Sequence, residues 1–361
     1  MRIGIDVSMI DVNKAGIGYY AHSLIKALAE VDGKNEYFLI THDGNLLKGL
    51  RLPENFSIIQ IKAPSGNLKW MLRCLRPIRE LELDYFISPS NLFWGCVLRN
   101  CVTIVHDIGQ VLYPKFFPKK GNIFYRIELN WLLRFGGIVI TPSKAVKRDI
   151  ESKFKLVRSK VFVVTEGLHD WTFAEYSKVE KEAVIEKYKL PSKYVLSVGT
   201  LEPRKNLINA ILGFSEFLRT EPDYKFVIVG KKGWFYDEIF EVVKEYDLQD
   251  LILFLGYVPD EDLPIIYDLS HFVVSLSYYE GFGLPLIEAN ARKKLVLASD
   301  IPAYKELDIS AMYVEETSNP IKVGRAMNVI SNKKFEPKPK LFDTYSWKSS
   351  AKKLLRILGN K

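Results

Sequence analysis

The sequence predicts an α/β protein with two domains, each built on a parallel sheet. Short runs of β-branched and aromatic residues alternate with segments of helical period, and strands spaced by helices pair in parallel as βαβ units. The series stops at the irregular stretch Glu166–Tyr176 and resumes with a new strand after Leu190. A chain of 361 residues also exceeds the usual size of one domain. We therefore expect domains at 1–170 and 171–342.

Eight segments have the composition of buried strands, because Val, Ile, Leu and aromatic residues dominate them. They are Arg2–Asp6, Tyr37–Thr41, Val102–Val105, Ile138–Thr141, Val195–Val198, Phe226–Val229, Phe272–Ser275 and Leu295–Ala298. Between the first two, Tyr20, Leu24 and Leu28 recur at helical spacing and predict a helix whose apolar face packs on the sheet. The chain closes with an amphipathic helix within 343–361.

Composition indicates a folded cytoplasmic protein. Apolar residues make up 48% of the chain and charged residues 26%, and no long polar tract interrupts them. No apolar run reaches the roughly 18 residues of a membrane helix, and Arg2 and Asp6 interrupt the apolar N-terminus, which indicates a strand rather than a secretion signal. The three cysteines show no Cys-x-x-Cys spacing, which favours a reducing compartment.

Positive charge is concentrated in one part of the chain. Residues 115–160 hold 12 Lys or Arg against 3 Asp or Glu, a surplus that could face anionic lipid, nucleic acid or a phosphorylated substrate, or be only a solvated helical face. In Asn67–Leu83, Trp70 and Ile78 accompany several arginines, a pattern that can lie on an anionic bilayer. Peripheral contact with the inner face of an anionic membrane is our hypothesis, and we expect no nucleic-acid partner.

The most informative motif is YYEGFGLPLIEANA, in which seven residues separate Glu280 from Glu288. Pro285 lies where a helix would begin, and Gly281 and Gly283 allow positive φ and close approach to a ligand. Free N–H groups at that helix start would attract a diphosphate, and a carboxylate beside them could accept hydrogen bonds from sugar or ribose hydroxyls. The motif suits a nucleotide sugar. A helix-dipole charge plus a surface residue is the alternative for the two glutamates.

A second motif, VLSVGTLEPRKNL, is a strand that ends at Gly199, followed by a loop with Arg204 and Lys205. Ligands bind beyond the carboxyl ends of strands in open α/β sheets, so the two cations could stabilise a departing diphosphate. A solvated pair of loop residues is the alternative. Gly230, in the glycine turn after the next strand, could line the same crevice, although turn formation also explains it.

The first domain contributes two further candidates. Gly16 and Gly18 belong to a Gly-x-Gly-x-x-Ala match that opens a helix, but nine residues separate Gly16 from the strand end at Asp6, too many for the tight turn of a dinucleotide site. We expect a glycine-rich loop facing a cleft instead. His106 and Asp107 follow a strand, where histidine could bind a sugar hydroxyl or move a proton, or be only structural.

We expect no cofactor and no metal site. Asp260-Glu261-Asp262 has the Asp-x-Asp spacing that can hold Mg²⁺ against a diphosphate, but Leu263-Pro264 follows, so capping of a helix is the stronger explanation. No other group of His, Cys, Asp or Glu has metal-ligand spacing, and no Gly-x-x-x-x-Gly-Lys-Ser/Thr loop occurs in the sequence.

Together these motifs resemble the retaining GT-B glycosyltransferases of family 4, a group that includes bacterial mannosyl-, rhamnosyl- and glucosyltransferases. The resemblance is strongest from Tyr194 to Leu307 and extends to the glycine loop, the His-Asp pair and Thr141-Pro142-Ser143. It implies two Rossmann-like domains whose parallel sheets face a central cleft. It also implies metal-independent transfer of a hexose to a glycan or lipid-linked acceptor in cell-surface polysaccharide synthesis.

The resemblance assigns a role to each part of the chain. Residues 1–170 would bind the acceptor, 171–342 the nucleotide sugar, and the helix of 343–361 would cross back to the first domain. Thr200 departs from the family pattern, because many relatives carry an arginine directly after the glycine that ends this strand. Lys205 is therefore a firmer assignment than Arg204.

Residue by residue, the resemblance implies that Glu288 holds the ribose and Glu280 the hydroxyls of the transferred sugar. Arg204 and Lys205 would face the diphosphate, and His106 would contact the donor sugar near the reacting carbon. The other implied positions, whose backbone would border the sugar or phosphates, are Gly281, Phe282, Gly283, Leu284, Gly230, Gly16 and Gly18.

Three other functions compete with this interpretation. A sugar-nucleotide epimerase of similar shape would need no acceptor, and an NAD-dependent oxidoreductase is kept open by the match from Gly16 to Ala21. A scaffold that binds nucleotide sugars without turnover is disfavoured, because both glutamates, both cations and His106 are present.

Overall fold

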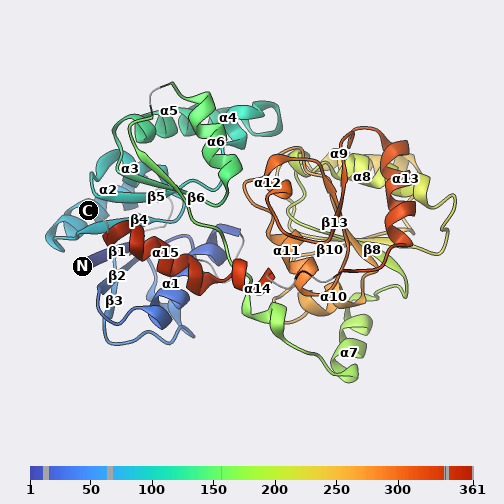
Figure 1. Cartoon of the computed structure of the whole chain (residues 1–361), viewed down its shortest axis with the longest axis horizontal. Helices are drawn as coiled ribbons and strands as arrows, with labels where there is room; N and C mark the ends of the chain where they lie inside the picture. Colours follow the sequence, from blue (N-terminus) through green and yellow to red (C-terminus); the bar gives the residue numbers. More distant parts are fainter. Residues whose placement is uncertain (11–15, 63–67, 156, 337, 339–340, 360–361) are drawn as a thin grey trace. The chain divides into compact units, whose positions relative to one another are not determined.

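The chain folds into two compact units, each with its own parallel sheet (Figure 1). The computed structural model describes residues 1–361 apart from 11–15, 63–67, 156, 337, 339–340 and 360–361. The first unit comprises Met1–Leu112, Lys120–Gly167 and Asp343–Lys361, and the second comprises Tyr113–Lys119 and Leu168–Phe342. The α/β class with two parallel sheets, predicted from the alternation of strands and helices, is confirmed.

Within the described residues, the first unit has a seven-stranded parallel sheet of order β3-β2-β1-β4-β5-β6-β7. Its strands are β1 (Arg2–Asp6), β2 (Glu36–Thr41), β3 (Phe56–Gln60), β4 (Tyr85–Ser88), β5 (Cys101–Ile104), β6 (Ile138–Thr141) and β7 (Lys160–Val163). Its longer helices are α1 (Gly16–Val31), α2 (Leu68–Glu80), α3 (Leu92–Val97), α5 (Lys119–Phe135), α6 (Lys144–Lys153) and α15 (Trp347–Gly359), joined by the short α4 (Gly109–Leu112).

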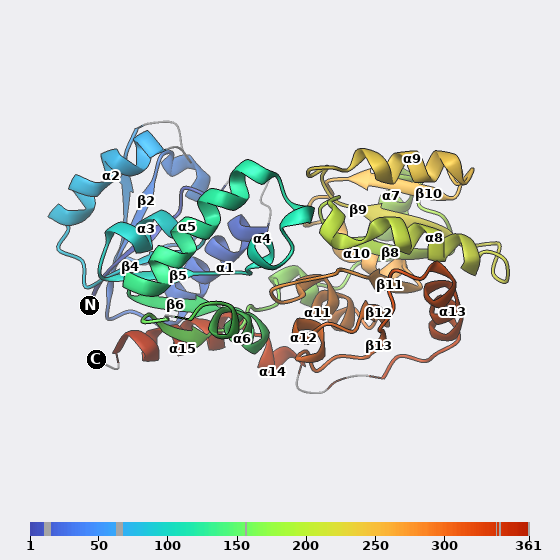
Figure 2. The ribbon, with the colours of Figure 1, turned by 90° about the horizontal axis from the view of Figure 1, so that it is seen from above.

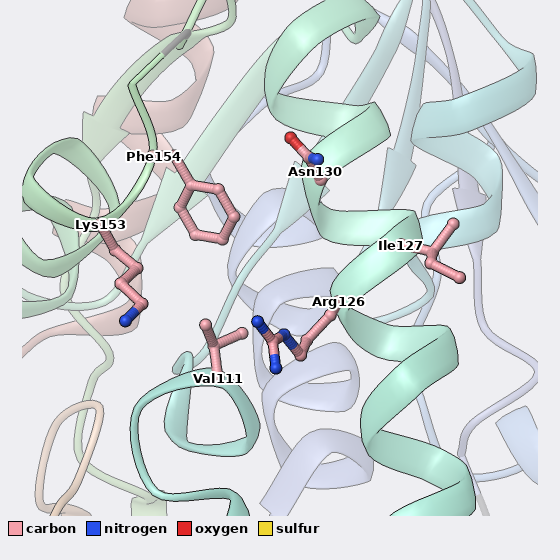
Figure 3. A pocket seen from close by; sticks show the side chains of 6 residues that line it. All are labelled: Val111, Arg126, Ile127, Asn130, Lys153 and Phe154. Atoms are coloured by element: carbon pink, nitrogen blue, oxygen red, sulfur yellow. The ribbon is translucent and has the colours of Figure 1, made fainter.

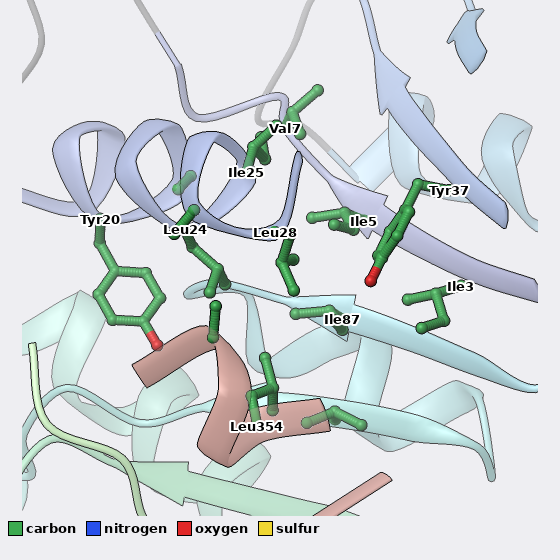
Figure 4. Close-up of a cluster of buried hydrophobic side chains, with 14 of the residues drawn as sticks. Ile3, Ile5, Val7, Tyr20, Leu24, Ile25, Leu28, Tyr37, Ile87 and Leu354 are labelled. Atoms are coloured by element: carbon green, nitrogen blue, oxygen red, sulfur yellow. The ribbon is translucent and has the colours of Figure 1, made fainter. Parts of the chain in front are cut away.

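One face of this sheet is covered by the first and the last helix of the chain. Tyr20, Leu24 and Leu28 of α1 are buried in the same cluster as Leu354 of α15 (Figure 4), as expected from their helical spacing. The cluster includes residues from the middle strands of the sheet, such as Ile87. The closing helix is thus part of the hydrophobic core of the first unit.

The opposite face of the sheet is covered by α2, α3 and α5 (Figure 2). Trp70 and Ile78 of α2 are buried there with Phe86 and Trp94. Because successive residues of a strand point to opposite faces, Phe86 lies on this side while its neighbour Ile87 lies on the other. The hypothesis that Trp70 and Ile78 meet a membrane is therefore wrong, since both side chains lie in the protein core.

The second unit has a six-stranded parallel sheet of order β10-β9-β8-β11-β12-β13 in the described part of the chain. Its strands are β8 (Tyr194–Val198), β9 (Lys225–Val229), β10 (Ile252–Gly256), β11 (Phe272–Ser275), β12 (Val296–Ser299) and β13 (Ala311–Val314). Its helices are α7 (Lys178–Tyr188), α8 (Leu207–Phe217), α9 (Asp237–Glu245), α10 (Leu263–Leu269), α11 (Leu284–Ala291), α12 (Pro302–Lys305) and α13 (Pro320–Ser331), and α14 (Leu341–Thr344) precedes α15 in the chain. Phe214, Phe217, Phe226 and Phe272 meet in its core.

The eight predicted strands are all present, within one or two residues of their predicted ends. The described residues contain five more, of which β3, β7, β10 and β13 lie at sheet edges. All four edge strands are partly exposed. β3 and β7 also carry polar residues, so these two lack the continuous apolar run of a strand covered on both faces. The fifth, β4, is a fully buried interior strand.

A short segment between α4 and α5 belongs to the second unit rather than to the first. The Trp234 indole N–H donates to the carbonyl of Phe116 at 2.6 Å, and the ring of Phe116 stacks on Tyr278 with 5.0 Å between centroids. Tyr278 is the first residue of the predicted sugar-binding motif, so residues 113–119 pack against the loop that carries Glu280.

Candidate active site

Two charged loops of the second unit lie at the same edge of its sheet. β8 and β11 are neighbouring parallel strands, so the loops that follow them leave the sheet at their shared carboxyl edge. The loop after β8 forms a 3-10 turn (Pro203–Lys205) with Arg204 and Lys205, and the loop after β11 carries Glu280. These groups therefore meet although Lys205 and Glu280 lie 75 positions apart in the chain.

The Glu280 carboxylate bridges both cations. Its Oε2 accepts a hydrogen bond from Arg204 Nη1 at 2.6 Å, and its Oε1 accepts from Lys205 Nζ at 2.6 Å. Ser277 Oγ donates to Oε1 at 2.7 Å. Arg204 also donates through Nη2 to Glu202 at 2.6 Å. Sequence reasoning treated the acidic motif and the basic loop separately, and Glu202 was not identified at all.

The charges in this cluster shift the pKa values of its carboxyl groups. Burial alone would raise the pKa of Glu280, but the charges of Arg204 and Lys205 outweigh it and lower the pKa to about 2. Burial raises the pKa of Glu202, against the opposing charge of Arg204. The cluster thus pairs one guanidinium group and one ammonium group with two carboxylates in a largely buried environment. An incoming anion can compete there with Glu280 for the two cations.

Backbone geometry holds the two loops together. Tyr278 N donates to the carbonyl of Arg204 at 3.0 Å, and Asn206 ends the 3-10 turn in the left-handed region with φ of 57°. Gly230, after β9, lies so close to Gly199 that a Cβ there would be 1.9 Å from the Gly199 carbonyl oxygen. Close backbone packing therefore requires glycine at position 230.

Helix α11 begins where the sequence predicted, with Pro285 in its first turn. Gly283 precedes it with φ of 125°, and a Cβ there would lie 2.9 Å from the Tyr304 ring. Because Gly283 has no side chain, it supplies no side-chain cap to the first N–H groups of α11. Glycine at this position thus leaves an open helix start next to the Glu280 loop, with Phe282 and Leu284 on either side in sequence.

Glu288 lies inside α11 and is buried among aromatic groups. Tyr267 Oη donates to its Oε2 at 3.0 Å, and His169 Nε2 lies 3.7 Å from its Oε1. Trp171 stacks on both His169 and Tyr267, and its buried indole N–H has no hydrogen-bond partner in the described part of the chain. Sequence reasoning missed all three neighbours, because they come from separate segments that only the fold brings together.

His106 follows β5 in the first unit, and both of its ring nitrogens are engaged. Nε2 lies 2.7 Å from the Pro89 carbonyl oxygen, which can only accept a hydrogen bond, so Nε2 carries a proton. Nδ1 lies 3.3 Å from Glu166 Oε1. Burial opposes a charge on His106, but the hydrogen bond and charge of Glu166 outweigh it and raise its pKa. Asp107 accepts from Gly109 N at 2.7 Å. Glu166 was not identified from the sequence.

The predicted glycine-rich loop is a helix where the structure describes it. Gly16 is the first residue of α1, and Gly18 is buried within the helix, while residues 11–15 lie outside the described part of the chain. The expectation of a loop at these two glycines is therefore wrong.

Asp262 of the Asp-x-Asp sequence forms hydrogen bonds with side chains of the neighbouring helix α7. Asp262 Oδ2 accepts from Lys187 Nζ and from Tyr188 Oη, both at 2.7 Å. Asp262 occupies the N-cap position of α10, but its side chain makes no capping hydrogen bond, so the predicted capping role is wrong for this side chain. Among the described residues, no three His, Cys, Asp or Glu side chains are grouped as a metal site would need.

Solved structures with the same architecture include named glycosyltransferases. The crystal structure of Anabaena Alr3699/HepE in complex with UDP and glucose has a TM-score of 0.75 over 99% of each chain at 15% identity. WaaG, a glycosyltransferase involved in lipopolysaccharide biosynthesis, has a TM-score of 0.74 over 99% of this chain and 100% of its own at 14% identity. The fold is that of the GT-B glycosyltransferases.

Sequence comparisons identify the family. Residues 15–170 match the model for Glycosyltransferase Family 4, and residues 179–346 match the model for glycosyl transferases group 1. The chain is therefore a member of glycosyltransferase family 4. Nothing in the comparisons supports the epimerase or the NAD-dependent oxidoreductase.

Relatives in Escherichia coli have been named for mannosyl transfer. The chain is 28% identical to O-antigen chain mannosyltransferase B over 85% of its own length and 84% of that protein. It is 33% identical to the serotype-specific mannosyltransferase WbdA over 71% of its own length, but this covers only 33% of WbdA.

Proposed function

We propose that the second unit binds a nucleotide diphosphate sugar at the carboxyl ends of β8 and β11, and that the enzyme transfers mannose to a glycan or lipid-linked acceptor in polysaccharide synthesis. In this proposal residues 1–170 bind the acceptor, 171–342 bind the donor, and 343–361 complete the first domain. The observation that carries it is the bridge from Glu280 to Arg204 and Lys205 beside the open start of α11.

Arg204 and Lys205 would meet the diphosphate. A nucleotide diphosphate leaving group gains negative charge as the glycosidic bond breaks, and preorganised positive groups stabilise that charge. The two cations and the N–H groups at the start of α11, flanked by Gly281, Phe282, Gly283 and Leu284, offer such groups without a metal ion. The bound diphosphate would take over some of the hydrogen bonds that Arg204 and Lys205 now donate to Glu280.

Glu280 would hold the cations in place and bind a hydroxyl of the donor sugar. A carboxylate can accept about four hydrogen bonds, and those from Arg204, Lys205 and Ser277 account for three. One acceptor position is left for a sugar hydroxyl. The pKa of about 2 keeps the group ionised at physiological pH.

The remaining site residues complete the proposed complex. Glu288, held by Tyr267, would accept hydrogen bonds from the ribose. His106, which Pro89 and Glu166 already orient, would contact the donor sugar near the reacting carbon. Backbone near Gly230, Gly16 and Gly18 would border the phosphate and acceptor side.

Retention of the anomeric configuration and a cytoplasmic location, peripheral at the inner face of the membrane, also belong to this proposal. The named activity of the relatives supports mannose as the sugar. None of the helices in the described part of the chain combines the length and apolar character that a bilayer crossing needs.

The proposal is tested first by donor binding and then by transfer. Melting scans with GDP, UDP, ADP and dTDP should reveal one stabilising nucleotide, because a ligand at 100 times its Kd adds about 2.7 kcal/mol. Transfer from the matching mannose donor should persist in excess EDTA, with the anomer of the product read by NMR.

Lys205→Ala should lose roughly 10²–10³ in rate, while Lys244→Ala, an exposed lysine of α9, should not. Activity that disappears in EDTA and returns with Mg²⁺ would contradict the metal-free mechanism.

A further inference from the structure

Helix α5 exposes a continuous apolar face on the surface of the first unit. Five large side chains on this face are between 52% and 70% exposed: Ile123, Phe124, Ile127, Trp131 and Phe135. Four of them recur at four-residue spacing, so they lie in one line along the helix, and Phe124 lies beside that line. A contiguous exposed patch of this kind marks an interaction surface.

The other face of α5 fixes the helix in the fold. Leu129, Leu132 and Leu133 are fully buried, and a Cβ at Gly95 of α3 would lie 2.3 Å from Leu132 Cδ1. The exposed apolar residues are therefore not the core-facing side of α5, because its leucines already fill that role. The helix has two apolar faces, one toward the sheet and one toward solvent.

The charges beside the exposed face are positive. Arg126 and Arg134 are exposed on the same helix, and the guanidinium of Arg134 lies over the Phe135 ring at 5.3 Å. The only acidic residue in the sequence of α5, Glu128, is half-buried, and burial raises its pKa. The face thus combines aromatic and aliphatic side chains with cations, as helices at the surface of anionic membranes do.

A pocket of about 280 Å³ lies between α5 and the end of α6 (Figure 3). Arg126 and Lys153 line it from opposite walls, together with Asn130 and three apolar side chains. In the described part of the chain neither cation forms an ion pair with an acidic residue, and the pocket lining contains no acid. An anionic headgroup could enter it while acyl chains meet the apolar face of α5.

We propose that the α5 face, with the Arg126 and Lys153 pocket beside it, docks the first unit on a bilayer of anionic phospholipid. This inference rests on one part of the proposed function, the lipid-linked acceptor, because docking would bring the enzyme to an acceptor carried by a lipid. It replaces α2 as the membrane-facing helix, because Trp70 and Ile78 of α2 are buried in the core.

The test is co-sedimentation of the full chain with vesicles. The wild type is expected to bind mixed phosphatidylcholine–phosphatidylglycerol vesicles at low salt and to bind pure phosphatidylcholine more weakly. The double variant Phe124→Gln/Trp131→Gln is expected to bind at least about tenfold more weakly, because two exposed side chains that would enter the bilayer are lost. Arg126→Gln/Arg134→Gln should weaken binding about fivefold for each arginine, and this effect should fade at high salt.

Val179→Gln is the matched control, because Val179 is 73% exposed on α7 of the second unit. It should bind vesicles as the wild type does. Equal binding by the double variant, loss in the control, or no binding to mixed vesicles would overturn the inference. So would light scattering that shows a dimer broken by the double variant, since the face would then bind a second copy.

Nucleotide calorimetry on the same variants separates this inference from the proposed function. All of them should bind the donor nucleotide with wild-type affinity. Vesicle binding without any nucleotide binding would contradict the donor site and support the α5 inference, whereas the reverse result would contradict the α5 inference only.

Discussion

Replacing Glu280 with glutamine keeps the shape of the side chain but removes the charge that binds Arg204 and Lys205. Although burial opposes it, the pKa of Glu280 falls from 4.5 to about 2 under the influence of these cations. Each unit of pKa shift corresponds to about 1.4 kcal/mol. The free energy of unfolding of the second unit should therefore fall by about 3 kcal/mol at neutral pH.

The pH dependence of this loss follows from the direction of the shift. Because folding lowers the pKa of Glu280, the ionised carboxylate stabilises the fold fully above the unfolded pKa of 4.5, and this contribution is lost as the pH falls toward 2. The difference between wild type and Glu280→Gln should be constant near neutral pH and shrink across that window.

Urea unfolding at several pH values measures the difference, with Glu186→Gln, exposed on α7, as the control. The variant should also lose transfer activity while it keeps affinity for the nucleoside diphosphate, whose phosphates can take the released cations. Equal stability of variant and wild type at neutral pH, or a difference that persists to pH 2, would refute the reasoning from the ion-pair cluster.

Three further changes test other parts of the site. Glu288→Gln should weaken donor binding by roughly 1.5–3 kcal/mol through lost charged hydrogen bonds; unchanged affinity in calorimetry with normal melting would remove Glu288 from the site. His106→Gln should remove stability that the wild type has below pH 6.5 and loses as the pH rises through its raised pKa; parallel pH–stability curves would contradict this. Gly230→Ala should destabilise the second unit by about 1–3 kcal/mol because its Cβ would meet the Gly199 carbonyl, and Gly33→Ala, with open space around it, is the control in denaturant melts.

Much of the fold could be predicted from local pattern. Interior strands such as β8 and β11 have continuous apolar runs because helices cover both faces of their sheet. The start of α11 could be predicted because proline is favoured in the first helical turn. Edge strands such as β3 were missed, because half-exposed positions need not be apolar.

The candidate site was predictable in its parts but not in its connections. Sequence placed Lys205 and Glu280 at strand ends, yet their pairing depends on β8 and β11 being neighbours in the sheet. Glu166 and His169 fall in a stretch whose irregular sequence indicated only a domain boundary. Side chains from such segments acquire partners through tertiary packing, which leaves no local periodic pattern.

The sequence by itself determined the α/β class, the family motifs and the concentration of positive charge in 115–160. Only the tertiary structure decided which amphipathic helix faces solvent with its apolar side. The periodicity of α2 is the same whether Trp70 packs on a sheet or on a lipid surface, and packing on the sheet buries it. In α5 the leucines take up the sheet-facing positions, so Trp131 and Phe124 remain exposed. Helical periodicity defines the faces of a helix, whereas the neighbouring elements determine what each face contacts.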